Sequence, residues 1–373
     1  MSNKKLAILG IIAAVMLVWA VFQSKISNKS RTVSAGLAYL VSGVNTDDIG
    51  SIVIKSGDKT LNLQRQSGRF VVADKNNYPA DTKKINELIT DCLEIEVSSQ
   101  VVTDNPANHE DLGVTEDKAK TIIKFLKPDS SELVGIIIGN TKENGQSSYV
   151  RLTSNDKVYV TSESPWIESD AINYVKTQIT ALMRKDTAMV TVNSPNGKYV
   201  LKPIADSEDV ELVNLPAGKK LKQSEAVNIF TALSSLNFTN VMKNPGDLNF
   251  DRHYICKLYN STEFTFDIAS KDGATYVTCR ALFTEGRPES IKKDEPEEKL
   301  KEVEEKLLLD DKADDFTKRH IGWVYEISPY KAKYLTMELS DLVEDEAEVE
   351  ITENPDPNAI LNKIQSDKQP GGL

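Results

Sequence analysis

The stretch Tyr78–Pro106, YPADTKKINELITDCLEIEVSSQVVTDNP, decides how the chain is organised. Asp81 or Thr82 is the expected N-cap, because a short side-chain oxygen there can accept a hydrogen bond from the unpaired amides of a first helical turn. Apolar residues then recur at helical spacing, which predicts a helix with one face against a core. They are Ile85, Leu88, Ile89, Cys92 and Leu93. Ile95 and Val97 follow with a period of two, so a short strand is expected next.

A looser copy of this plan lies at residues 215–245. Ser224 is the expected N-cap there, and an apolar stripe precedes a closing Asn-Pro turn. The stripe is Val227, Phe230, Leu233 and Leu236, followed by Phe238. Strand-like segments follow in the same order in both halves, which predicts two copies of one module with a duplicated origin. The alternative is that two ordinary α+β domains share generic patterning.

Each half opens with three short strand patterns that turn residues separate. The patterns lie at 52–54, 61–63 and 70–72 in the first half and at 190–192, 199–201 and 210–213 in the second. More strand patterns follow each helix, so the segments predict antiparallel sheets whose apolar faces are covered by helices. A second helix is expected after Pro165. Its inward stripe is Trp166, Ile167, Ile172, Val175, Ile179 and Leu182.

The predicted fold class is α+β, with an N-terminal transmembrane helix followed by two tandem, duplicated modules of antiparallel sheet covered by helices. A chain of 373 residues is long enough for two such domains. The expected divisions are a signal anchor at 1–23, a linker at 24–48, module one at 49–185, module two at 186–342 with a charged insertion at 285–319, and an acidic tail at 343–373.

The apolar run Leu6–Phe22, LAILGIIAAVMLVWAVF, contains no charged residue and is at the short end of the length for a membrane-spanning helix. A cleaved signal peptide is the alternative, but the run is long for a signal sequence and no small-residue cleavage site follows it directly. We therefore expect a retained signal anchor in the inner (cell) membrane, with the bulk of the chain extracytoplasmic. Basic residues on the two sides of the run nearly balance, so they do not decide the orientation.

Charge and cysteine content exclude some classes of protein. The formal net charge of −11 argues against nucleic-acid binding, which needs a basic surface. Three cysteines imply no disulfide framework. Cys256 and Cys279 lie in neighbouring strand patterns and could pair in an oxidising compartment. Buried free thiols are the favoured interpretation, because cysteine packs as a small apolar residue.

The charged insertion at 285–319 contains one apolar stripe at helical spacing. The stripe is Leu300, Val303, Leu307 and Leu308. Two interpretations stay open, a solvated excursion from the fold and a partner-docking arm that lays this stripe in a groove. The tail at 343–373 is acidic and then rich in Pro and Gly, a composition that cannot bury a core, so it is expected to be disordered.

The sequence offers no catalytic, cofactor-binding or metal-binding motif. His109, His253 and His320 are far apart and none has the spacing of a zinc site. No glycine-rich phosphate loop and no nucleophile elbow is present. His109 forms a tight polar trio with Glu110 and Asp111, and a loop-stabilising role for it is favoured over catalysis because no nucleophile is adjacent. We therefore expect no enzyme activity and no cofactor.

Four motifs stand together in the first half of the chain. They are GVNTDDIGSIVI at 43–54, GRFVV at 68–72, NNYPADTKKINELI at 76–89 and DNPANHEDLGV at 104–114. Together they resemble the domain-of-unknown-function family 4340, most closely over residues 43–160. The resemblance implies one amino-terminal span and a repeated β-rich extracytoplasmic region, often encoded beside ABC transporters and gliding-motility subunits. Its motifs are structural, so it transfers no catalytic residue.

The expected function is a non-enzymatic, membrane-anchored extracytoplasmic subunit of an ABC-transporter-associated or related cell-envelope complex. Its expected partners are transporter permease, ATPase or auxiliary subunits. The alternative is a free-standing envelope scaffold or ligand-binding protein. An envelope hydrolase is a third class, which an open cleft lined by His109 and carboxylates would favour. A flat, partly apolar surface on either module would favour the subunit.

Overall fold

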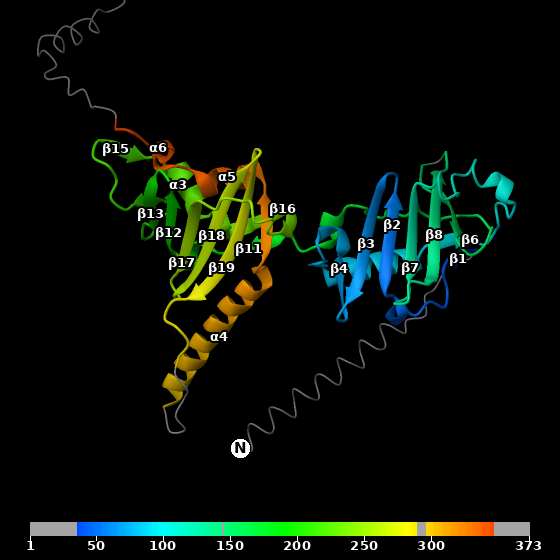
Figure 1. Ribbon diagram of the computed structural model, residues 1–373, viewed down its shortest axis with the longest axis horizontal. Helices are drawn as coiled ribbons and strands as arrows, with labels where there is room; N and C mark the ends of the chain where they lie inside the picture. Colours follow the sequence, from blue (N-terminus) through cyan, green and yellow to red (C-terminus); the bar gives the residue numbers. More distant parts are fainter. Residues whose placement is uncertain (1–35, 144, 289–295, 347–373) are drawn as a thin grey trace, which may run out of the picture. The chain divides into compact units, whose positions relative to one another are not determined.

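The computed structural model of the protein describes residues 36–143, 145–288 and 296–346, which Figure 1 colours along the chain. These residues form two compact units, and the first ends at Lys176 while the second begins at Thr177. The predicted span Leu6–Phe22 and the tail from residue 347 lie outside the described residues. Within the described ranges, no helix is long and apolar enough to cross a membrane.

The predicted α+β class is wrong, because the described fold is mostly antiparallel β-sheet with few helices. Sheets of eight and nine strands dominate the two units. The helix expected after Pro165 does not form. That segment contains only the 3-10 turn η4 (Ala171–Tyr174) and the strand β11 (Gln178–Thr180). Its β-branched residues fit helical spacing, but such side chains favour extended backbone, and Ile179 joins the sheet of the second unit.

The first unit is built on an eight-stranded antiparallel sheet. In spatial order its strands are β10 (Tyr159–Val160), β9 (Ser148–Leu152), β8 (Glu132–Thr141), β7 (Thr121–Leu126), β2 (Ser51–Ser56), β3 (Lys59–Gln66), β4 (Arg69–Val72) and β5 (Tyr78–Pro79). Ile54 pairs with Leu61 and with Ile123, and all three side chains are buried on one face. A two-stranded sheet of β1 (Leu37–Tyr39) and β6 (Glu96–Ser98) lies beside it in the same unit.

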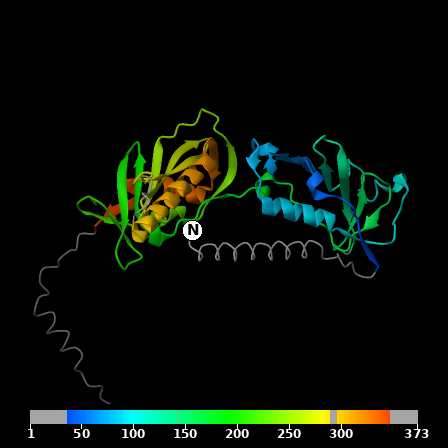
Figure 2. The same ribbon diagram turned by 90° about the horizontal axis from the view of Figure 1, so that it is seen from below.

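Helix α2 (Thr82–Leu93) covers the apolar face of this sheet, as Figure 2 shows. Its predicted N-cap is confirmed at Asp81, whose side chain accepts a hydrogen bond of 2.9 Å from the Lys83 amide. The predicted stripe of five apolar residues is buried. The opposite face carries a smaller cluster, in which Val114 covers Ile122 and Ile137. Short 3-10 turns complete the unit: η1 (Thr46–Asp48), η2 (Ala73–Lys75) and η3 (Pro106–Asn108).

The second unit is built on a nine-stranded antiparallel sheet. In spatial order its strands are β11, β16 (Leu236–Lys243), β20 (Trp323–Ile327), β19 (Ala274–Phe283), β18 (Thr262–Lys271), β17 (Arg252–Leu258), β12 (Thr187–Ser194), β13 (Gly197–Pro203) and β14 (Val210–Leu212). Its helices and 3-10 turns are η5 (Arg184–Asp186), α3 (Gln223–Phe230), η6 (Ala232–Ser235), α4 (Glu297–His320), α5 (Pro329–Thr336) and α6 (Leu339–Leu342). The Tyr254 hydroxyl donates to the Ile229 carbonyl oxygen at 2.7 Å, which ties the sheet to α3.

The expected N-cap of α3 is wrong. The helix begins at Gln223 rather than after Ser224. The Gln223 side chain explains this, because its amide accepts from the Val210 N–H and donates to the Val210 carbonyl oxygen, at 3.2 and 3.0 Å. A contact distant in sequence therefore fixes the start of the helix, which local capping preferences do not capture.

The two sheets share one strand order. The run β10-β9-β8-β7-β2-β3-β4 in the first unit has the same order as β20-β19-β18-β17-β12-β13-β14 in the second. A duplicated module would produce this arrangement, and the duplicated origin itself stays a prediction. The division between the units falls at Lys176 rather than at 185, because β11 pairs with β16 of the second sheet.

The first residues of the expected disordered tail are ordered in strand β21 (Val343–Asp345). This strand pairs with β15 (Lys219–Leu221) in a separate two-stranded sheet. Lys219 lies 2.6 Å from Asp345, and Lys220 lies 3.1 Å from Glu344. These cross-strand ion pairs join acidic residues of β21 to lysines of β15 and support the pairing of the two strands.

Candidate functional site

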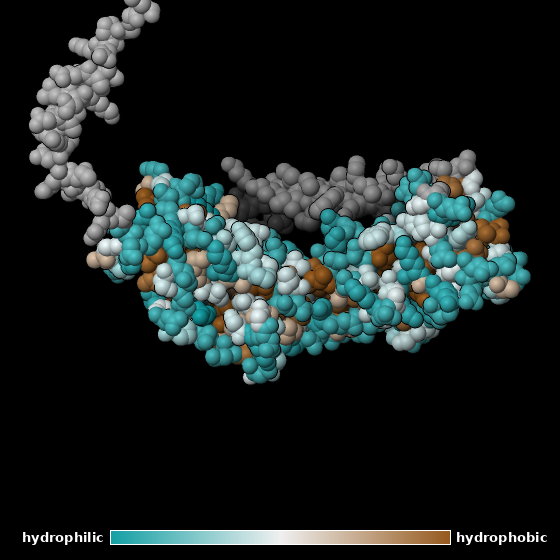
Figure 3. Space-filling model, turned by 90° about the horizontal axis from the view of Figure 1, so that it is seen from above, coloured by the Kyte–Doolittle hydropathy of each residue, from teal (hydrophilic) through white to brown (hydrophobic). Residues whose placement is uncertain are grey.

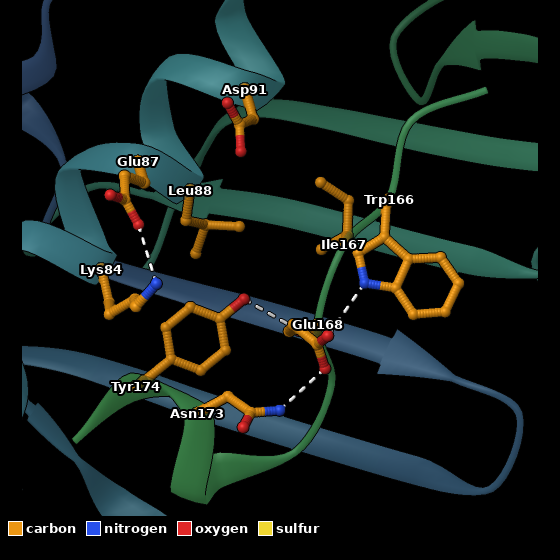
Figure 4. A pocket seen from close by; sticks show the side chains of 9 residues that line it. All are labelled: Lys84, Glu87, Leu88, Asp91, Trp166, Ile167, Glu168, Asn173 and Tyr174. Carbon is orange, nitrogen blue, oxygen red and sulfur yellow. Dashed lines mark hydrogen bonds and ion pairs between the residues drawn. The ribbon is translucent and has the colours of Figure 1, made fainter. Parts of the chain in front are cut away.

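A groove in the first unit lies between α2 and the segment that replaces the predicted helix (Figure 4). It has a volume of about 300 Å³. Helix α2 contributes Lys84, Glu87, Leu88 and Asp91. The facing segment contributes Trp166, Ile167, Glu168, Asn173 and Tyr174.

Glu168 fixes the conformation of this segment. Its carboxylate accepts one hydrogen bond from the Trp166 indole N–H and one from the Asn173 amide, both at 2.8 Å. Its carbonyl oxygen accepts from the Tyr174 hydroxyl, also at 2.8 Å. Burial raises the pKa of the Tyr174 phenol, so this donor keeps its proton. The Asp81 amide donates to the Tyr174 carbonyl oxygen at 2.8 Å, which ties the segment to the start of α2.

Trp166 is the most exposed large apolar side chain among the described residues, at 77%. Figure 4 shows the indole standing out from the segment with its N–H turned toward Glu168. The polar end of the side chain is therefore satisfied while the ring face is open to solvent. On the face of the molecule in Figure 3, apolar residues are scattered among hydrophilic ones.

A second hollow of about 680 Å³ lies on the other side of Trp166 and Ile167. We call the two hollows together the Trp166 groove. Its charged lining residues are Lys84, Glu87, Asp91, Glu94, Glu96, Glu163 and Glu168. Lys84 is bonded to Glu87 at 3.1 Å, and this hydrogen bond lowers the pKa of the Glu87 carboxyl. The groove therefore has an exposed aromatic ring, an apolar floor and a strong excess of carboxylates.

The predicted docking stripe lies in the second unit, on the N-terminal half of α4. Leu300, Val303 and Leu307 are half-buried and Leu308 is 52% exposed. In Figure 1 this half of α4 extends past the end of the sheet, whereas the last turns pack on it through Phe316 and His320. Docking by this stripe stays a prediction, and its residues do not line the Trp166 groove.

The three histidines occupy separate places in the fold. The Nε2–H of His109 donates to the Asp156 carbonyl oxygen at 2.9 Å, a contact that holds the loop at 105–119. His253 Nδ1 lies 2.7 Å from Asp267, which also pairs with Arg280. His320 is buried against Tyr325. Among the described residues, no three His, Cys, Asp or Glu side chains are grouped to hold a metal ion.

All three cysteines are buried free thiols, as favoured from the sequence. Cys256 lies on β17 and Cys279 on β19, with β18 between them. Two strand spacings are about 10 Å, which is too far for a disulfide. Burial raises the pKa of the Cys92 and Cys256 thiols to about 12, so neither is a reactive thiolate at neutral pH.

The motif resemblance is confirmed by a comparison with protein families. Residues 71–253 match the family described as domain of unknown function (DUF4340). This part of the chain is a DUF4340 domain. It contains α2, the whole Trp166 groove and the first strands of the second unit. No curated protein matches the chain.

Sequence reasoning missed the role of Trp166 within the DUF4340 domain, because it assigned this residue to the buried stripe of a helix. One signal pointed the other way. Pro165 precedes Trp166 and Ile167, and the polar run Glu168-Ser169-Asp170 follows directly, which places an aromatic residue near the edge of a polar loop. Glu168 had no signal of its own, since its partners are visible only in the fold.

Proposed function

We propose that the chain is a non-enzymatic, membrane-anchored extracytoplasmic subunit of a cell-envelope complex, of the kind associated with ABC transporters. In this proposal the Trp166 groove docks a partner polypeptide. The observation that carries it is the 77% exposed indole, held in one orientation by Glu168 beside α2. Exposed tryptophans in shaped surfaces are the residues that most often dominate the binding energy of protein interfaces.

The form of the groove supports a polypeptide partner over a small molecule. Pockets for small ligands are concave and mainly apolar, and they enclose most of the ligand. The Trp166 groove instead consists of two hollows on either side of a projecting ring, and charged residues make up much of its lining. A chain segment that crosses the ring can place a side chain in each hollow.

The membrane and transporter parts of the proposal rest on the sequence. The apolar run Leu6–Phe22 supports an anchor that holds the two units close to the bilayer. The DUF4340 resemblance supports a transporter as the complex. Partners in the same membrane would then meet the groove at a high effective concentration, so a modest contact would be sufficient.

The test is affinity purification of the full-length protein in a mild detergent, with mass spectrometry of what accompanies it. We expect transporter permease and ATPase subunits to accompany the wild-type chain and to be lost from Trp166→Ala. Tyr259→Ala is the matched control, because Tyr259 is 66% exposed and lies in the second unit. Recovery of the chain alone, under conditions that preserve other membrane complexes, would overturn the proposal.

A further inference from the structure

Three carboxylates of the Trp166 groove have no ion-pair partner among the described residues. Among the residues that the structure describes, no lysine, arginine or histidine forms an ion pair with Asp91, Glu96 or Glu163. Lys84 is the one basic residue in the lining, and it is bonded to Glu87. Like charges that share one hollow raise each other's energy, and a bound cation relieves this repulsion. The groove is therefore a region of negative potential, because its one lining lysine offsets only part of the carboxylate charge.

The indole ring adds a second feature that favours a cation. The face of a tryptophan ring attracts ammonium and guanidinium groups more strongly than the other aromatic rings do. The Trp166 N–H donates to the Glu168 carboxylate, so a negative charge also lies at the edge of this ring. Both hydrogen bonds to the Glu168 carboxylate come from neutral donors, Trp166 and Asn173, and leave its charge in place.

Between the charged groups, the groove has an apolar floor. Leu88 lies in the first hollow and Ile95 in the second, and Ile167 lines both. A free ammonium compound or a metal ion would contact the carboxylates but leave the apolar floor exposed to water. A polypeptide with basic and aliphatic side chains in alternation would use the carboxylates, the ring and the floor together.

The comparison of the two units indicates why the groove is open. In the second unit the segment after β20 forms α5, which packs against α3. In the first unit the corresponding segment after β10 is extended, and the short turn η4 packs against α2. The position that α5 fills beside α3 in the second unit thus has no helix beside α2 in the first unit, and a partner can bind there.

We infer that the occupant of the Trp166 groove is a basic segment of a partner polypeptide, with an arginine or lysine on the indole face and aliphatic side chains on the apolar floor. This inference rests on the proposed docking role of the groove. Arginine suits the site best, because a planar guanidinium can stack on the ring and bond to a carboxylate at once.

The test measures binding of labelled peptides to the full-length protein in a neutral detergent, by fluorescence anisotropy. The probes are a hexapeptide of alternating arginine and leucine, its citrulline counterpart without charge, and its glutamate counterpart. We expect only the arginine peptide to bind, and more weakly at high salt. Trp166→Ala is expected to weaken it about tenfold or more, whereas Tyr259→Ala should leave it unchanged.

A variant with three fewer negative charges in the groove separates charge from shape. The triple change Asp91→Asn, Glu96→Gln and Glu163→Gln keeps side-chain size and is expected to reduce the affinity for the arginine peptide strongly while leaving that for the citrulline peptide unchanged. An unchanged thermal melting curve shows that the triple variant is folded. If the triple variant melts early, the single change Glu163→Gln replaces it, because this side chain is exposed. The single change is expected to weaken binding of the arginine peptide in the same direction but by less.

Several results would overturn the inference. They are equal binding of the citrulline peptide, equal binding of free arginine amide, and no binding of the arginine peptide at millimolar concentration. If the Trp166→Ala variant still loses the co-purifying transporter subunits in any of these cases, the docking role stands and only the inferred basic character of the partner segment is contradicted. If Trp166→Ala releases no subunit, the docking role itself fails.

Discussion

Glu168 shows how one residue fixes the conformation of an exposed aromatic surface. Its carboxylate holds the Trp166 indole and the Asn173 amide, and its carbonyl oxygen holds the Tyr174 hydroxyl. Hydrogen bonds to a charged acceptor are stronger than those between neutral groups, so the exposed ring keeps one orientation. An aromatic side chain that is already fixed loses little conformational entropy when a partner binds.

His320 makes the stability of the second unit depend on pH. Burial lowers the pKa of His320 from its ordinary value of 6.5 to about 4, and the Arg319 charge adds to this. Between these values the unfolded chain binds a proton that the folded chain does not. Stability is therefore lost as pH falls from 6.5 toward 4, by up to about 3 kcal/mol, and this group causes no further loss below that range.

The measurement is urea unfolding of the wild type and of His320→Gln at pH 7 and pH 4.5. Glutamine can still bond to the Tyr325 hydroxyl, which lies 2.7 Å from His320 Nδ1, but it does not titrate. The wild type is expected to lose more stability than the variant between the two pH values. Equal losses would show that His320 is not the group responsible.

At the scale of elements, α2 depends on its cap. Asp81→Ala removes the acceptor for the Lys83 amide, and we expect it to reduce the free energy of unfolding of the first unit by about 1 kcal/mol. Asp81→Asn keeps a capping oxygen and is the control, with a much smaller loss. Chemical denaturation followed by circular dichroism measures both, and equal losses for the two variants would contradict the capping role.

Helix α4 protects an open strand edge. Strand β20 pairs with β19 only at residues 275–277 of β19. Farther along β19, the Thr317 hydroxyl of α4 accepts a hydrogen bond from the Ala281 N–H at 2.9 Å and donates one to the Ala281 carbonyl oxygen at 2.8 Å. Thr317→Val removes both bonds, so we expect faster hydrogen exchange of the β19 peptide that contains Ala281. Thr317→Ser keeps the hydroxyl and should exchange at nearly the wild-type rate; an unchanged rate in Thr317→Val would contradict this role.

The two walls of the Trp166 groove differ in how far the sequence predicts them. Helix α2 follows from its cap and its apolar stripe, which are local signals. The facing segment does not, because Ile172, Val175 and Ile179 mimic helical spacing while their contacts belong to different elements. Val175 ends η4 and Ile179 enters the second sheet. Strand order and the hydrogen bonds of Glu168 depend on pairings distant in sequence, which no local pattern encodes.

At the scale of the whole molecule, two units with one strand order have different surfaces. In the second unit, α5 covers the helix α3, and the inserted helix α4 covers the edge of strand β19. The first unit keeps the corresponding place open and lines it with carboxylates around one tryptophan. The shared order provides the scaffold, and the segment after the last strand of each module determines whether a groove remains.

The central claim is that the Trp166 groove docks a subunit of a membrane complex in the cell. The most direct measurement places a photo-crosslinking side chain at Lys84, which lines the groove, and in a parallel variant at Tyr259. The account predicts a crosslink from position 84 to one transporter subunit, through a segment rich in arginine or lysine, and its loss when Trp166→Ala is added. No crosslink at position 84, or the same crosslink from both positions, would contradict it.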